Sequence, residues 1–141
     1  MATTRNASTH WEGSLFEGAG KVTLESSGIG TYDVSWASRA EDANGKTSPE
    51  ELIAAAHSSC FSMALSNGLA KAGTPATSLD TSAAVDFVPG TGITEIRLTV
   101  TGVVEGMSSD DFVAAATAAK EGCPVSQALA AVPIKLEASL A

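Results

Sequence analysis

The chain has 141 residues, of which 44% are hydrophobic, and this length fits one compact domain, residues 1–141, with a substantial core. Sixteen acidic residues against eight basic ones give a formal net charge of −8, and the basic residues form no cluster, so a nucleic-acid surface is not expected. The first residues carry no secretory signal pattern; the expected compartment is the cytoplasm, where two cysteines are normally reduced.

The first half of the chain predicts short strands followed by one long helix. From residue 9 to about residue 37, short apolar positions are broken by glycine-rich stretches, which is typical of antiparallel strands. A polar loop over residues 38–47 leads to the helix. There Ser48 is the expected N-cap, in a capping box with Glu51, and Gly73 is the expected stop. Small and apolar residues occur all round this helix, so we expect it to be central.

The second half predicts a hairpin, two helices and a final strand. The expected ranges are strands over 79–88 and 93–104, a helix from 108 or 109 to about 122, a short helical segment over 125–129 and a strand over 134–140. Apolar and polar residues alternate in the second and last strands, so one face of each should be buried. The order of elements predicts an α+β fold rather than a βαβ series.

Two cysteines are the candidate reactive groups. Cys60 lies inside the long helix among small side chains, which leave room for a substrate, although a structural core cysteine is the ordinary alternative. Cys123 precedes a proline at an expected helix N-terminus, where unpaired backbone N–H groups stabilise a thiolate. An incidental buried thiol is the alternative there.

A reactive cysteine in the middle of an apolar helix needs a nearby cation, because burial raises its pKa. Among the arginines Arg39 is the best candidate, and Glu50 could hold its guanidinium in a bidentate fork; an exposed loop charge and a first-turn acid are the alternatives. Glu50 precedes Cys60 by ten residues, about 15 Å along an unbroken helix. The pair would therefore reach Cys60 of a second subunit across a twofold interface, unless the helix kinks.

Two alternatives come from other functional classes. A metal-binding module would use His10, His57, Cys60 and Cys123, but the chain lacks the paired Cys-x-x-Cys spacing of structural zinc sites. His57 is more simply interpreted as a buried histidine bonded to a neighbouring group. A non-catalytic carrier would hold an apolar ligand in a pocket lined by side chains such as Phe61 and Met63.

Three stretches carry a resemblance to a known family. They are HWEG at residues 10–13, SPEELIAAAHSSCFSMAL at residues 48–65 and GCPVSQ at residues 122–127. With them the chain resembles the osmotically inducible protein C (OsmC) peroxidases, which are similar to the organic hydroperoxide resistance proteins. The resemblance spans almost the whole chain and implies one OsmC-like domain, an intertwined homodimer whose antiparallel sheets wrap central helices, and active sites at the subunit interface.

The resemblance also implies roles for four residues. Cys60 would be the peroxidatic thiol, Cys123 the resolving thiol, and Arg39 with Glu50 the pair that keeps Cys60 ionised and positions the peroxide. The implied substrates are organic hydroperoxides, with hydrogen peroxide also accepted. The Cys60–Cys123 disulfide would be reset by an external dithiol, in some members a lipoyl group. No cofactor, metal, nucleic acid or membrane is expected.

Overall fold

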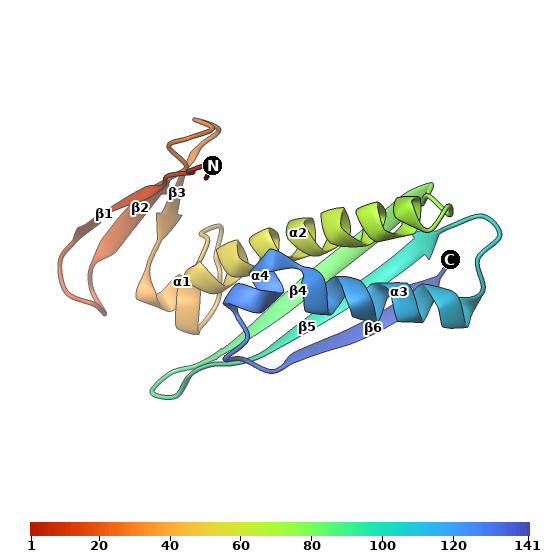
Figure 1. The fold of residues 1–141 in the computed structure, drawn as a ribbon. Coiled ribbons are helices and arrows are strands. Elements are labelled where there is room, and N and C mark those ends of the chain that lie inside the picture. Colours follow the sequence, from red (N-terminus) through yellow and green to blue (C-terminus); the bar gives the residue numbers. More distant parts are fainter. The chain divides into compact units, whose positions relative to one another are not determined.

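The structure is a computed structural model that describes all residues from 1 to 141 (Figure 1). It divides into two compact units, Met1–Leu52 and Ile53–Ala141. None of its helices combines the length and the apolar character that a membrane crossing requires.

The first unit begins with a three-stranded antiparallel sheet, as predicted. Strands β1 (Ser8–Glu12), β2 (Ala19–Thr23) and β3 (Thr31–Val34) are hydrogen-bonded in that order. The short helix α1 (Trp36–Ala40) follows, where the sequence had predicted the end of a strand and the start of a loop. That prediction was wrong because Ser35 and Ser38 form a reciprocal capping box, each side chain accepting from the other's backbone N–H.

Helix α2 (Pro49–Lys71) begins and ends as its local signals predict. The Ser48 hydroxyl accepts a hydrogen bond from the Glu51 N–H, at 3.1 Å. The Glu51 carboxylate does not complete the capping box; it accepts from the Thr47 hydroxyl, at 2.6 Å. At the other end Gly73 adopts φ 84°, the left-handed conformation that closes a helix and favours glycine.

The second unit contains a three-stranded sheet of mixed direction. β4 (Ser78–Val88) and β5 (Gly92–Val103) form the predicted antiparallel hairpin, and β6 (Ile134–Leu140) pairs with β5 in parallel. Helices α3 (Ser109–Gly122) and α4 (Pro124–Ala128) connect β5 to β6, as a parallel pair requires a crossover.

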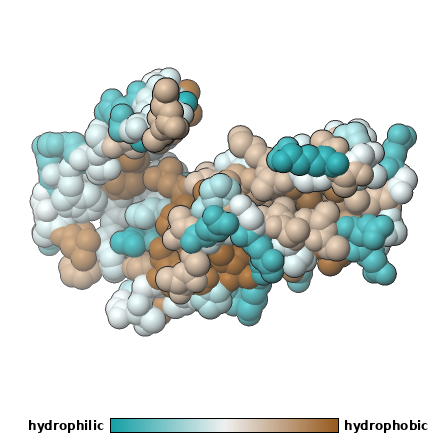
Figure 2. Space-filling view, in the orientation of Figure 1, coloured by the Kyte–Doolittle hydropathy of each residue, from teal (hydrophilic) through white to brown (hydrophobic).

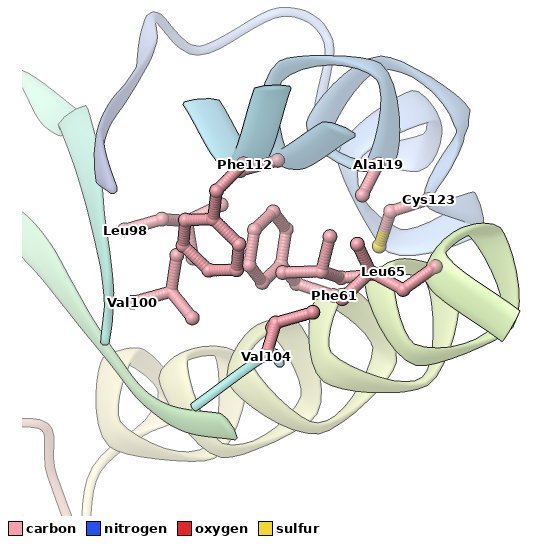
Figure 3. Packing of buried hydrophobic residues seen from close by; sticks show 10 residues of the cluster. Phe61, Leu65, Leu98, Val100, Val104, Phe112, Ala119 and Cys123 are labelled. Atoms are coloured by element: carbon pink, nitrogen blue, oxygen red, sulfur yellow. The ribbon is translucent and has the colours of Figure 1, made fainter. Parts of the chain in front are cut away.

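The core of this unit lies between the helices and the sheet (Figure 3). Every fourth residue of α2 forms a buried stripe that continues from His57 through Phe61 and Leu65 to Leu69. The core residues that pack with this stripe come from β5, α3 and the segments beside them: Leu98, Val100, Val104, Phe112, Ala116, Ala119 and Cys123. The opposite face of α2 is open in the single chain, where Met63 is 71% exposed, so the helix is not surrounded on all sides.

Gly102 on β5 allows the closest approach in this core. A Cβ atom at this position would lie 2.6 Å from the ring of Phe112, which is fully buried. We therefore expect Gly102→Ala to lower the free energy of unfolding by about 1–3 kcal/mol through overpacking, measured by urea denaturation. At Gly122 a Cβ meets nothing within 4 Å, so Gly122→Ala should stay within about 0.5 kcal/mol of the parent. Equal stability of the two variants would contradict this account.

Candidate active site

The two cysteines face each other inside the second unit. The sulfur of Cys60 on α2 lies 3.0 Å from that of Cys123, and both residues are free thiols. Cys123 is fully buried, whereas Cys60 is partly exposed. A disulfide has an S–S length of about 2.05 Å, so the two sulfurs need to approach by only about 1 Å to bond. The fold thus brings together two residues that are distant in the sequence.

Local structure fixes the position of Cys123 between two helices. Its backbone N–H donates to the carbonyl of Ala119 at 2.8 Å and ends α3, and its own extended conformation (φ −63°, ψ 123°) makes it the N-cap of α4. Pro124 occupies the first position of α4, where a missing N–H costs nothing. The thiol is therefore held by backbone that is constrained on both sides.

The environment of Cys60 disfavours its thiolate in the isolated chain. Burial raises the pKa of Cys60, and the hydrogen bond and charge of Cys123 raise it further. The backbone N–H of Val125 opposes these effects without cancelling them. No arginine or lysine of the second unit is among these causes, so this unit by itself favours the protonated form of Cys60.

Cys123 shows the opposite behaviour. Burial alone raises the pKa of Cys123, but hydrogen bonds with Cys60, with the backbone and hydroxyl of Ser126 and with the backbone of Val125 outweigh it, and the net pKa is lowered. These hydrogen bonds favour the thiolate form of Cys123. The roles implied by the sequence need the negative charge on Cys60.

A second polar contact joins the same two helices. His57 Nε2 on α2 lies 2.7 Å from Ser126 Oγ on α4, and both side chains are buried. Burial lowers the pKa of His57, so its ring is neutral, and Nδ1 has no hydrogen-bond partner. The expectation that His57 bonds a neighbouring group is confirmed. Ser126 was not singled out from the sequence, although its place three residues after Cys123 on a predicted helix was a usable signal.

The metal-binding alternative receives no support from the geometry. The chain contains no group of three or more His, Cys, Asp or Glu side chains arranged to hold a metal ion. His57, one of the proposed ligands, bonds to Ser126 instead.

Arg39 and Glu50 form the forked contact that the sequence suggested. Arg39 Nε lies 3.0 Å from Glu50 Oε1, and its Nη2 lies 2.9 Å from Oε2. Arg39 comes from the last turn of α1 and Glu50 from the first turn of α2, and the Glu50 side chain is only 8% exposed. A bidentate pair of this kind fixes the plane and direction of the guanidinium.

Arg39 also lines a largely apolar hollow within the first unit. The hollow has a volume of about 390 Å³. Its apolar walls come from the sheet, α1 and the start of α2: Trp11, Leu15, Val22, Val34, Trp36, Pro49 and Leu52. A charged guanidinium thus lies beside space suited to a hydrocarbon group.

Comparison with known proteins places the chain in a family. The family model described as OsmC-like protein matches residues 41–137. The curated Peroxiredoxin OsmC of Escherichia coli (strain K12) is 42% identical over 134 residues, which cover 93% of each protein. This chain belongs to the OsmC-like protein family. The predicted family is therefore confirmed, and so is the prediction of a peroxidase-type enzyme.

Solved structures of the OsmC-like family share the fold. The organic hydroperoxide resistance protein OsmC of Legionella pneumophila has a TM-score of 0.71 at 22% identity, covering 99% of this chain and 98% of its own. The organic hydroperoxide resistance protein of Elizabethkingia anophelis has a TM-score of 0.73 at 21% identity, with all of both chains covered (100% each). These likenesses confirm the predicted α+β fold of the OsmC type.

Proposed function

We propose that this OsmC-like enzyme is a cysteine-based peroxidase that reduces organic hydroperoxides, and also hydrogen peroxide. The Cys60 thiolate attacks the O–O bond, an alcohol or water leaves, and Cys60 becomes a sulfenic acid. Cys123 then attacks the Cys60 sulfur, water departs, and an external dithiol reduces the disulfide. The observation that carries this proposal is the 3.0 Å distance between the two free thiols.

The ionisation of Cys60 is assigned to Arg39 and Glu50 of a second subunit. Glu50 and Cys60 lie on the same helix ten residues apart, which corresponds to about 15 Å along the axis, and α2 has no proline after its first residue. No proline kinks α2 between Glu50 and Cys60. A guanidinium paired with Glu50 is therefore kept about 15 Å along the axis from Cys60 of the same helix. An antiparallel partner helix would bring the pair to Cys60 and shift the charge of the thiol pair onto it.

Exposed apolar residues support a homodimer, which we propose is intertwined and built from one OsmC-like domain, residues 1–141, in each subunit. Phe16 in the first unit is 74% exposed and Met63 on α2 is 71% exposed. Hydrophobic surface is visible on both units (Figure 2). Large apolar side chains that are exposed to water to this extent are typical of a surface that a partner covers.

The hollow beside Arg39 supports an organic substrate. Its apolar walls would hold the hydrocarbon part of a hydroperoxide, while the guanidinium binds the peroxide oxygens. The reductant is assigned to the class of external dithiols, including lipoyl groups on a partner protein, and a reducing compartment such as the cytoplasm would supply one. The non-catalytic carrier remains the alternative, and disulfide formation separates the two.

Cys123→Ser is expected to stop the catalytic cycle after one turnover. The variant should consume about one equivalent of alkyl hydroperoxide per chain, because Cys60 still reacts but has no thiol partner. Mass spectrometry should then find Cys60 as a sulfenic, sulfinic or sulfonic acid, whereas the parent protein forms a Cys60–Cys123 bridge within seconds. Repeated cycling by the variant, or persistent free thiols in the parent, would refute the proposed mechanism.

A further inference from the structure

A buried hydrogen bond joins α2 to α4 beside the two cysteines. His57 Nε2 on α2 lies 2.7 Å from Ser126 Oγ on α4, and both side chains are buried. His57 precedes Cys60 by three residues, so the two share one face of α2. Ser126 follows Cys123 by three residues in the other segment. The proposed peroxidase cycle uses the two sulfurs but gives this neighbouring hydrogen bond no role.

Helix α4 has few polar groups that could fix it against α2. It contains only five residues, Pro124–Ala128, and its N-terminus has no side-chain capping hydrogen bond. The Gln127 side chain donates to a backbone carbonyl of α3, at 3.4 Å, and so does not bind α2. Val125 packs against the core, but apolar packing is not directional. Among the polar side chains of α4, the hydroxyl of Ser126 is therefore the one that is bonded to α2, through His57.

The surroundings of His57 make this hydrogen bond hard to replace. The ring is fully buried, and its Nδ1 has no hydrogen-bond partner, so Ser126 supplies the hydrogen bond of the ring. A buried polar atom that loses its partner is left unsatisfied, because water cannot reach it. Separation of α4 from α2 would therefore be penalised at both ends of the bond.

We propose that His57 and Ser126 are positioning residues, whose hydrogen bond holds the two sulfurs at bonding distance and so favours disulfide closure. This inference rests on the proposed peroxidase cycle. In closure, the Cys123 sulfur bonds to the Cys60 sulfur, the S–O bond of the sulfenic acid breaks, and the hydroxyl leaves as water with the proton of Cys123. The sulfurs lie 3.0 Å apart in the reduced protein. A misplacement of about 1 Å can slow such a step about a hundredfold, so a contact that fixes α4 beside α2 matters.

The test is the equilibrium between the reduced protein and its Cys60–Cys123 disulfide in dithiothreitol buffers. The dithiol gives two electrons and two protons to the protein disulfide and becomes a cyclic disulfide, and mass spectrometry after thiol alkylation counts the two protein forms. His57→Leu and Ser126→Ala should each shift this equilibrium about tenfold toward the reduced form, because the thiols are no longer held together. His57→Gln and Ser126→Thr keep a polar atom for the hydrogen bond and should stay close to the parent.

A double variant separates positioning from stability. Removal of one partner leaves the other unsatisfied and destabilises a protein, whereas replacement of both by apolar groups can be nearly neutral. His57→Leu/Ser126→Ala should therefore unfold at a temperature closer to that of the parent than either single variant does, yet keep the tenfold shift of the thiol–disulfide equilibrium. Gly102→Ala, which is overpacked elsewhere in the core, should unfold at a lower temperature with an unshifted equilibrium.

A parent-like equilibrium in the folded double variant would overturn the positioning role. The equilibrium measurement involves no peroxide, so its failure and the failure of the proposed function are distinguishable. A shifted equilibrium in a protein that consumes no hydroperoxide would refute the peroxidase cycle and leave standing the inference that this hydrogen bond positions the sulfurs.

Discussion

Cys60→Ser is expected to abolish turnover of an alkyl hydroperoxide in the presence of a dithiol, with a loss of at least about a thousandfold. A serine hydroxyl stays protonated at neutral pH and cannot carry the oxygen of the peroxide as a sulfenic acid does. The measurement is steady-state consumption of the hydroperoxide, together with the first-turnover amplitude. Both should vanish.

The matched control is the same substitution at the other sulfur. Cys123→Ser should keep the first turnover and lose only the later ones, whereas Cys60→Ser should lose the first as well. The two positions share one site, with 3.0 Å between their sulfurs, so a general disturbance of packing would affect both alike. A full first turnover by Cys60→Ser would remove Cys60 from its proposed role.

Local chemistry made the long helix predictable from the sequence. The Ser48 cap, the proline at position 49 and the Gly73 stop act within one turn of the chain, and the structure shows the same boundaries. Helix α1 was missed because its cap pairs two serines rather than a serine with a glutamate. The expectation of antiparallel sheets was wrong for β6, which pairs with β5 in parallel, because apolar–polar alternation is the same for either strand direction.

The parts of the candidate site differ in how far the sequence could predict them. The fork between Arg39 and Glu50 was one of two interpretations that the sequence left open, beside an exposed loop charge and a first-turn acid, and the structure contains it. The distance between the sulfurs depends on how α2 and α4 pack, which no short stretch encodes. The lowered pKa of Cys123 depends first on its hydrogen bond with Cys60 of α2, a tertiary contact, and then on Ser126 and Val125 of α4. The first of these contacts exists only once α2 and α4 have packed together.

Arg39→Ala is expected to lower the rate of the first turnover at neutral pH by about 10- to 1,000-fold, because the pKa of Cys60 rises when its proposed cation is removed. Since burial and Cys123 already raise the pKa of Cys60, the lost activity should return in part as the pH increases. Arg97→Ala is the matched control. Its guanidinium pairs with Asp86 and Glu95 on the sheet, so activity should be retained. Equal rates for both variants would contradict the role of Arg39.

Mixed dimers then decide which subunit supplies the arginine. In a dimer that joins one Cys60→Ser chain to one Arg39→Ala chain, a site shared between subunits is intact once: the wild-type Cys60 of one chain meets the wild-type Arg39 of the other. Such dimers, purified with two different tags, should show about half the wild-type activity at neutral pH, although the Cys60→Ser homodimer is inactive and the Arg39→Ala homodimer is strongly impaired. If Arg39 served the Cys60 of its own chain, the one remaining Cys60 would lack its arginine, and the mixed dimer would be no more active than the Arg39→Ala homodimer. Mixed dimers of confirmed composition with activity that low would therefore refute the shared site.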